Sequence, residues 1–597
     1  MNKLLSGAGE FVANVAPASV LYAVFVRAER PGRVVVDVDD RALADDPRIR
    51  TVLSGKNIDD ALCRLHESMA VAGHSAHDIL ARRKPLYLGE PIAVVVASSV
   101  SAAMDGAERL TVEFADVDNT ADPTLVTWSF GDGNQTATAL DTADYRLNTT
   151  LRVPRISATP MEPASAIAQW CARENRLMLT APTQGVHRVR DEICDMLGIT
   201  SAGLRVRTDD VGGAFGARIH ALREHAALLL AAHGLDAPIL WVADRQESMM
   251  AEYHARDLAV TIDAGFKRGG EIVALEVDMQ TDCGDALSVN YTPIVTQYFA
   301  AGVCGAYAIP SVSITVKAIR SFRTPTAAFR GAGHPEGCYV IERVLDEAAR
   351  GLGLSSLEIR RSNLIAARAD TVTGISLDGI DPADTLAMGA ENLSRLKARA
   401  NGRRSANVRH GFGISLYIKQ NGMGRKEDCV LGLSGAGKIV INVGSQSNGQ
   451  GHEQSFENIA ATILDVDIAE VELSGGDTDA LPSGTGTGGS AALTTTGAAV
   501  STGARALREK VIRVAAQHLE VSLEDIRFEG GTCRVGGTDL HIGLKELAAE
   551  ESLRRQIVSQ GAQEITITTT VGCHAAWVSV DTQTGVVRLL GYVACDD

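Results

Sequence analysis

The chain has 597 residues, 45% of them hydrophobic and 22% charged, which is the balance of an ordinary globular protein with room for three or four structural units. Its formal charge of −16 argues against a nucleic-acid-binding surface. No run of 18 or more apolar residues occurs, so the sequence predicts no membrane span.

The first 120 residues alternate apolar strands with a helix. Valine-rich residues 33–39 and 91–97 predict strands, residues 101–109 predict a helix, and residues 110–114 predict a further strand. This order is typical of a small α/β unit. Residues 117–150 are polar and rich in Asp, Thr and Asn, and they predict a linker.

After residue 151 the pattern mixes helices and strands. Apolar residues at helical spacing predict helices over residues 191–197, 224–233, 341–352 and 453–464. Gly198 and Gly234 are expected to end the first two helices. Strands are predicted over residues 438–443 and 586–593, and a second linker over residues 394–409.

The ten cysteines give no sign of a metal or disulfide framework. None of them forms a CxxC pair, and no histidine cluster accompanies them. The sequence therefore predicts no iron–sulfur or zinc site on this chain, and buried cysteines in a reducing cytoplasm.

Four segments are rich in glycine and small residues: 209–218, 328–337, 444–453 and 475–491. Glycine lets backbone N–H groups approach an anion without a Cβ clash. The third segment immediately precedes a predicted helix, whose N-terminus favours anions. Together the segments predict a cradle for a large, phosphate-bearing ligand, the alternative being that they are structural turns. No GxGxxG or GxxxxGK[ST] loop occurs, so a common nucleotide site is not indicated.

In chain order, short motifs in and around these segments resemble the molybdopterin-binding large subunits of the xanthine oxidase family. The motifs are YLGEPIAVVVA at 87–97, PTQG at 182–185, VGGAFG at 211–216, FRGAG at 329–333 and QSNGQGH at 446–452. The resemblance runs along essentially the whole chain. It implies an α+β fold with an N-terminal α/β hammerhead domain over residues 1–125. Two elongated, mixed α/β molybdopterin-binding domains would follow over residues 126–395 and 396–597, the last of them incomplete.

The resemblance also implies a cofactor and the residues that hold it. Molybdenum would be held by the pterin dithiolene, in the cytosine dinucleotide form, without any protein side chain as a metal ligand. The implied cofactor-binding residues are Gln184, Gly213, Phe215, Gly216, Arg330, Gln446, Gly449, Gln450, Gly451, Ser490 and Ala491, and the implied substrate pocket contains Phe329, Arg330 and Ala332.

Within this set the family pattern gives several residues a more definite place. Gln184 would lie near the apical oxygen of the metal, and Gln450 would hydrogen-bond the pterin. For Arg330 a structural salt bridge is the alternative, and for Gln184 a turn. His334 and His452 are expected to be structural.

Departures from the family pattern narrow the implied activity. No cysteine lies between residues 328 and 335, although the carbon-monoxide-oxidising branch has one there, and Cys338 lies beyond the loop. Ala332 and Ile219 stand where the purine branch has an aromatic residue and a glutamate. The resemblance therefore implies hydroxylation of an aldehyde or N-heteroaromatic carbon in a small molecule, with water-derived oxygen. Electrons would pass to a [2Fe–2S] small subunit and an FAD-binding medium subunit in a cytoplasmic hetero-oligomer.

The family's general base is a glutamate in a Gly-x-Gly-Glu segment, which is expected beyond residue 597. Glu546, Glu550, Glu551 and Glu564 do not follow a Gly-x-Gly and are predicted to be solvated. No catalytic residue is therefore expected on this chain, and a separate chain carrying the segment would complete the site. The alternatives are a non-catalytic cofactor-binding or scaffold protein, or an inactive truncated homologue. A flavin or nucleotide oxidoreductase is disfavoured because its fingerprint is missing.

Overall fold

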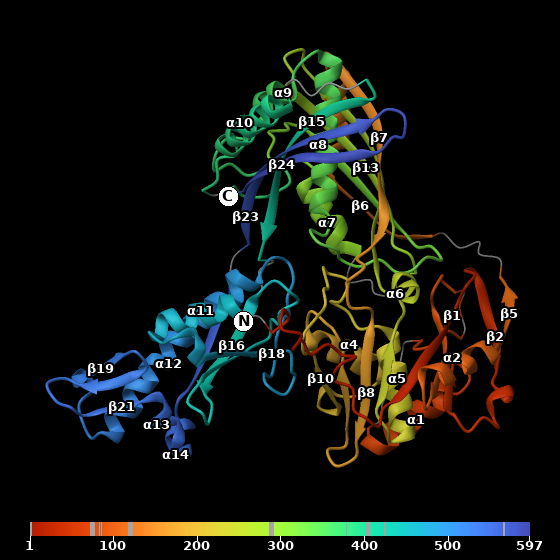
Figure 1. The fold of residues 1–597 in the computed structure, drawn as a ribbon. Coiled ribbons are helices and arrows are strands. Elements are labelled where there is room, and N and C mark those ends of the chain that lie inside the picture. The colour runs from red at the N-terminus through yellow and green to blue at the C-terminus, as the bar shows by residue number, and fades with distance from the viewer. Residues whose placement is uncertain are drawn as a thin grey trace.

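The largest sheet joins strands that are far apart in the sequence. The computed structural model describes residues 3–71, 78–82, 84, 86–117, 123–285, 292–377, 379–400, 406–422, 426–564 and 567–596 (Figure 1). The seven strands of this sheet lie in the order β10 (Leu204–Arg207), β9 (Arg176–Thr180), β8 (Ser165–Cys171), β11 (Ile239–Val242), β1 (Leu21–Arg27), β4 (Pro91–Ala97) and β3 (Ile49–Ser54). Its core includes apolar residues of α1 (Ile58–Met69), α4 (Val186–Leu197) and α5 (Arg223–Leu235).

The N-terminal part of the chain is built into this sheet. β1 pairs in parallel with β11, with Leu21 opposite Ile239. The predicted hammerhead unit and the unit that follows it thus share one sheet, and their boundary at residue 125 stays a prediction. β2 (Arg33–Asp39), β4, α2 (Val100–Arg109) and β5 (Thr111–Asp116) confirm the elements predicted for this part, and β2 and β5 form a separate two-stranded ribbon.

A five-stranded sheet forms the upper part of the molecule in Figure 1. Its order is β6 (Thr124–Gly131), β14 (Val312–Ile319), β13 (Ile272–Asp282), β12 (His254–Phe266) and β7 (Tyr145–Ser157), accompanied by α3 (Gly133–Asp141), α7 (Thr292–Gly302), α8 (His334–Leu352) and α9 (Ser356–Asn363). α6 (Arg245–Ala251) instead contacts the seven-stranded sheet, where Glu247 pairs with Arg27 of β1. The predicted linker over residues 117–150 is therefore wrong from residue 124 onwards, while residues 118–122 lie outside the described residues. Its polar composition comes from β6 and β7, the two edge strands, which expose alternate side chains.

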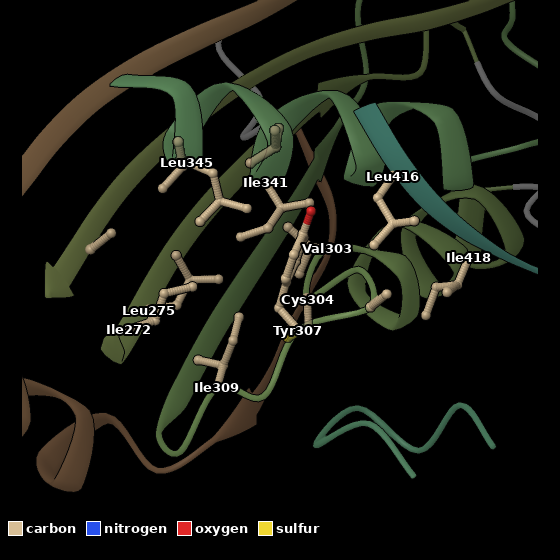
Figure 2. Packing of buried hydrophobic residues seen from close by; sticks show 14 of the residues in the cluster. Ile272, Leu275, Val303, Cys304, Tyr307, Ile309, Ile341, Leu345, Leu416 and Ile418 are labelled. Carbon is tan, nitrogen blue, oxygen red and sulfur yellow. The ribbon is translucent and has the colours of Figure 1, made fainter. Parts of the chain in front are cut away.

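A three-stranded sheet completes the core of this upper part. It consists of β15 (Val408–Asn421), β23 (Thr568–Asp581) and β24 (Val587–Asp596), with α10 (Pro382–Ala400) packed beside it. Leu416 and Ile418 of β15 join Ile341 and Leu345 of α8 in one hydrophobic cluster (Figure 2). The predicted linker over residues 394–409 is wrong at 394–400, because α10 continues to Ala400 and buries Leu396; residues 401–405 lie outside the described residues.

A four-stranded sheet forms the blue lobe at the lower left of Figure 1. Its order is β18 (Val471–Gly475), β17 (Ile439–Val443), β16 (Lys426–Leu433) and β22 (Val558–Glu564), with α11 (His452–Leu464) and α12 (Gly497–His518) in its core. A small sheet of β19 (Ile526–Glu529), β20 (Thr532–Val535) and β21 (His541–Gly543), with α13 (Leu544–Ala549) and α14 (Glu551–Arg554), lies at the outer end.

The predicted helices are all present, with shifted ends. α4 ends before Gly198, which adopts a φ of 65° as expected for a C-cap, but it begins five residues early. The predicted stop at Gly234 is wrong, because α5 runs on to Leu235 and is capped by Asp236 at a φ of 48°. α8 begins seven residues early, at His334. Among the described residues, no helix is both long and apolar enough to cross a bilayer.

Candidate functional site

One cavity of about 760 Å³ is lined by parts of all four glycine-rich segments. These parts follow β10, β14, β17 and β18 in the chain, and Gln184 after β9 and the end of β15 add further wall. Several of them are loops just past strand ends, a common place for ligand sites in α/β folds. The predicted site residues that line it are Gln184, Gly213, Phe215, Gly216, Phe329, Arg330, Ala332, Gly449, Gln450 and Ser490.

Gln184 fastens two of the glycine-rich segments together. Its Oε1 accepts a hydrogen bond from the Gly216 N–H at 2.7 Å, and its Nε2 donates to the Thr487 carbonyl at 2.9 Å. The side chain is only 6% exposed. Both ends of the amide are therefore committed to the backbone, and Gln184 fixes the distance between the two loops at the cavity wall.

Charged side chains with little exposed surface form hydrogen bonds that fix the backbone of the first glycine-rich segment. The Gly212 N–H donates to Glu162 Oε2 at 2.8 Å, and the guanidinium of Arg218 donates to Glu252 Oε2 at 3.2 Å and to the Gly213 carbonyl at 3.2 Å. Burial raises the pKa of Glu162 and is its largest influence, opposed by the hydrogen bond from Gly212 and the charge of Arg218. The network presents the loop backbone to the cavity in a fixed shape.

Phe215 is the main apolar surface of this segment. It adopts a φ of 57° and its ring is left 45% exposed. Its carbonyl accepts a hydrogen bond from the Arg330 N–H at 2.8 Å, which ties the first segment to the second. A flat ring held open at a cavity wall offers a face for stacking a planar ligand.

The second segment presents Arg330 at the cavity. Its backbone is held on both sides, because its carbonyl accepts from the Arg256 guanidinium at 3.2 Å. Arg256 also pairs with Glu336 and lies over the Phe329 ring at 5.2 Å. The Arg330 side chain forms no ion pair with any described residue, so the predicted alternative of a structural salt bridge finds no partner in the described part of the chain.

The third segment places backbone donors before the N-terminus of α11. Gly449 has a φ of 100°, and nothing lies within 4 Å of the position that a Cβ would take there. Gln450 accepts from the Asn448 N–H at 2.6 Å and pairs through Nε2 with His452 Nε2 at 3.0 Å. Asn448 Oδ1 is buried without a hydrogen-bond partner in the structure. Backbone donors at the N-terminus of a helix suit an anion or a polar ring.

Three predicted site residues do not line the cavity but support the residues that do. Gln446 is buried and donates through Nε2 to the Thr183 carbonyl at 2.5 Å, next to Gln184. Gly451 is the N-cap residue of α11. Ala491 is buried, and its carbonyl accepts the Thr495 N–H at 2.7 Å. Their assignment as cofactor-binding residues stays a prediction.

Lys419, at the end of β15, is a cavity residue that the sequence did not predict. Its Nζ donates to Ser490 Oγ at 2.8 Å, to Asn421 Oδ1 at 2.7 Å and to the Gln420 carbonyl at 2.9 Å. Burial lowers the pKa of Lys419. Lys419 does not lie in a glycine-rich segment. It alternates with the buried Leu416 and Ile418, a pattern that indicates only that Lys419 is on the other face of the strand. The sequence therefore contained no signal for a cavity residue at this position.

His334 is a second unpredicted member of the wall. The ring is 6% exposed and is stacked on Tyr298, with the centroids 5.0 Å apart. Burial, and next the charge of Lys419, lower its pKa to about 4. His334 is therefore neutral at pH 7. Its Nδ1 is buried without a hydrogen-bond partner in the structure.

The neutral state of His334 predicts a pH dependence of stability. The folded state has a pKa of about 4 against an ordinary value of 6.5, so it binds fewer protons than the unfolded state between these values. Stability should fall as pH drops from 6.5 to 4, by up to about 3 kcal/mol. The free energy of unfolding, measured with a denaturant at several pH values for the wild type and for His334→Gln, tests this pH dependence. Parallel curves for the two proteins would contradict the assignment.

Carboxylates are missing from the described lining of the cavity. Among the described residues that form its wall, none is an aspartate or a glutamate. Glu546, Glu550, Glu551 and Glu564 are exposed, as predicted, and lie outside the lining. A general base would therefore have to come from elsewhere.

Family models match most of the chain. Two models, both described as molybdopterin cofactor-binding domain, match residues 116–364 and 387–597. The gap between them begins after residue 364 and ends within α10.

Several curated proteins resemble the chain over most of its length. The nicotine 6-hydroxylase large subunit of Paenarthrobacter nicotinovorans is 27% identical, and the match covers 92% of this chain and 71% of that protein. The carbon monoxide dehydrogenase large chain of Hydrogenophaga pseudoflava is 25% identical, covering 100% and 81%. These relatives are, by name, large subunits or chains.

Solved structures share the fold. Quinoline 2-oxidoreductase from Pseudomonas putida 86 superimposes with a TM-score of 0.86 at 25% identity, covering 100% of this chain and 82% of that one. Aldehyde oxidoreductase from Desulfovibrio gigas gives 0.82 at 18% identity, covering 100% and 67%. The second likeness concerns the fold alone.

Proposed function

This chain belongs to the molybdopterin-binding large subunits of the xanthine oxidase family, and from that premise we propose that it hydroxylates an aldehyde or N-heteroaromatic carbon of a small molecule. The observation that carries the proposal is the cavity itself, where all four glycine-rich segments converge. Cys338, the cysteine nearest to the second segment, lies on α8 and is not part of the lining, which supports hydroxylation rather than oxidation of carbon monoxide.

The residues present fit a molybdenum–pterin group. A volume of about 760 Å³ lies within the range of cofactor sites. Gly213 and Gly449 have φ values of 100° and leave backbone accessible at the cavity, and Gly216, with a φ of 106°, lets the first segment approach the Ala328 carbonyl closely. Asn448 is also among the lining residues, and its buried Oδ1 has no hydrogen-bond partner among the described residues.

The chain's own residues would bind and orient the reactants. Gln184 and Gly216 hold the loops that frame the cofactor, and Gln450 with the N-terminus of α11 would receive its polar end. When bound, the molybdenum–pterin group supplies two-electron oxidation and the transfer of water-derived oxygen. Phe215 and Phe329 give the cavity apolar faces that orient a planar substrate and exclude water.

We further propose that the general base is supplied from outside this chain. The absence of an aspartate or glutamate among the described lining residues supports this. A carboxylate must lie within hydrogen-bond reach of the proton that it takes. The same observation favours a second candidate, a chain that binds the cofactor but does not turn over by itself.

The remaining partners follow from the family. We propose the cytosine dinucleotide form of the cofactor, a [2Fe–2S] small subunit and an FAD-binding medium subunit. Relatives named as a large chain and as the gamma subunit of a dehydrogenase complex support a multi-subunit assembly.

Metal loading tests the proposal. The full chain, produced in a host that makes the pterin cofactor, is expected to hold molybdenum and pterin in an approximately 1:1 ratio, measured by elemental analysis and pterin fluorescence. Dye reduction with benzaldehyde or quinoline should appear only when a chain carrying a Gly-x-Gly-Glu segment is added. A folded chain without molybdenum would refute the proposed function, and turnover by the isolated chain would refute the external base.

A further inference from the structure

The cavity is positively charged in a chain whose formal charge is −16. Arg330 and Lys419 line it, and among the described lining residues no aspartate or glutamate opposes them. A wall with two cations and no anion favours a negatively charged ligand.

Lys419 differs from the buried cations elsewhere in the chain. Arg27, Arg223 and Arg360 are each paired with a buried glutamate. The Lys419 ammonium instead donates to three neutral oxygens, on Ser490, Asn421 and Gln420, at 2.7–2.9 Å. These bonds fix its position without neutralising its charge. Desolvation lowers its pKa, and no carboxylate of a described residue counters that effect.

Arg330 lines the same cavity as Lys419. Its backbone is fixed by hydrogen bonds to Phe215 and from Arg256, while its guanidinium has no ion-pair partner among the described residues. His334, four residues further along, is close enough to Lys419 for the lysine charge to lower its pKa. The two cations therefore line the same cavity as the Phe215 ring.

We propose that Lys419 and Arg330 form an anion subsite that selects substrates bearing a carboxylate; this rests on the proposed function. A carboxylate supplies the missing counter-charge to both cations, and a planar aromatic acid also gains the Phe215 face. A phosphate of the cofactor has the same chemistry, so the test separates the two sources.

The main experiment compares matched substrates on the assembled holoenzyme. Lys419→Met should lower kcat/KM for 4-formylbenzoate or pyridine-3-carboxylate by about 10- to 100-fold, the range for a hydrogen bond to a charged group. The values for benzaldehyde and pyridine should change by less than about 3-fold. Lys317→Met, at an exposed lysine of β14, is the matched control and should change neither. Equal effects on charged and neutral substrates would overturn the proposal.

Molybdenum and pterin content identifies the source of the anion. Unchanged content in Lys419→Met supports a substrate subsite. Loss of the cofactor in that variant, with Lys317→Met fully loaded, would assign Lys419 to a cofactor phosphate and overturn the substrate assignment.

A binding measurement separates this proposal from the proposed function. Benzoate is titrated calorimetrically into the full-length wild type, Lys419→Met and Lys317→Met. Weakening by about 10-fold or more in the first variant alone supports the subsite, even where no aldehyde or heterocycle is oxidised. No benzoate binding by the wild type, or equal binding by all three proteins, would refute it.

Discussion

Replacing Gly216 with alanine is expected to lower the molybdenum and pterin content of the chain at least about tenfold. Gly216 has a φ of 106°, and an added Cβ would lie 2.5 Å from the Ala328 carbonyl oxygen. Backbone strain and a clash with a fixed carbonyl together cost a few kcal/mol, and 1.4 kcal/mol already corresponds to a tenfold change in binding. The neighbouring loop would have to move, because Ala328 lies in the second glycine-rich segment.

The same substitution would also weaken the link through Gln184. The Gly216 N–H donates to Gln184 Oε1, and the other end of that amide holds Thr487. A shift at residue 216 would thus disturb two walls of the cavity at once. Elemental analysis and pterin fluorescence of the purified variant measure the loss.

Gly374→Ala is the matched control for backbone strain. Gly374 has a φ of 85°, but nothing lies within 4 Å of its Cβ position, and it is not part of the cavity. Alanine there carries a similar left-handed strain without a clash. Its cofactor content should equal that of the wild type. Equal losses in the two variants would mean that general destabilisation, and not the geometry of the cradle, limits loading.

The second large effect is expected from Arg360→Met, which should reduce the free energy of unfolding by about 3–5 kcal/mol. Arg360 is fully buried and donates to Glu342 Oε2 at 2.8 Å and to Asp346 Oδ1 at 2.9 Å. Glu342 also accepts the Leu416 N–H of β15 at 3.0 Å, so this network joins α8 to the three-stranded sheet. Removing the arginine would leave the buried carboxylate without its counter-charge.

The loss should depend on pH in a defined direction. Burial raises the pKa of Glu342 and is its largest influence, while Arg360 is the first of the groups that lower it. Without Arg360, the neutral, protonated form of Glu342 costs less free energy in the buried site than the charged form. The variant should therefore be less destabilised at pH 5 than at pH 8, and Glu342→Gln in the same chain should restore part of the stability.

Arg395→Met provides the matched control, because Arg395 also pairs with a glutamate on a helix but is largely exposed. An exposed pair of this kind contributes about 0.3–0.5 kcal/mol. Urea unfolding and hydrogen exchange of α8 distinguish the two sites. A similar effect at both positions would show that the buried network contributes no more than a surface pair.

The parts of the site that consist of consecutive residues in short motifs could be predicted from the sequence. The glycine-rich segments indicated loops that approach a ligand, and the structure brings them to one cavity. Gln184, Phe215 and Arg330 were identified from motifs that span only a few residues. Gln446 and Gly451 come from the same motif as Gly449 and Gln450, yet neither of them lines the cavity. A motif gives the order of residues, but packing decides which of them face the cavity.

The two linkers were predicted from polar composition, and that prediction was wrong where the polar residues belong to half-exposed strands and helices. Residues 124–150 contain the edge strands β6 and β7, whose exposed faces are polar because water covers them. The end of α10 is polar for the same reason, although Leu396 anchors it in the core. Average polarity over a window cannot separate such elements from linkers.

By itself, the sequence determined the class of the chain, the positions of a minority of its helices and strands, and the loops that meet at the cavity, because periodicity and glycine motifs act over short distances. Only the tertiary structure decided which distant segments meet. The pairing of β1 with β11 and the contact between Lys419 and Ser490 join residues separated by more than 70 positions. The charge of the cavity arises from such contacts: a formal charge of −16 describes the whole chain, whereas packing placed two cations and no described carboxylate around the ligand space.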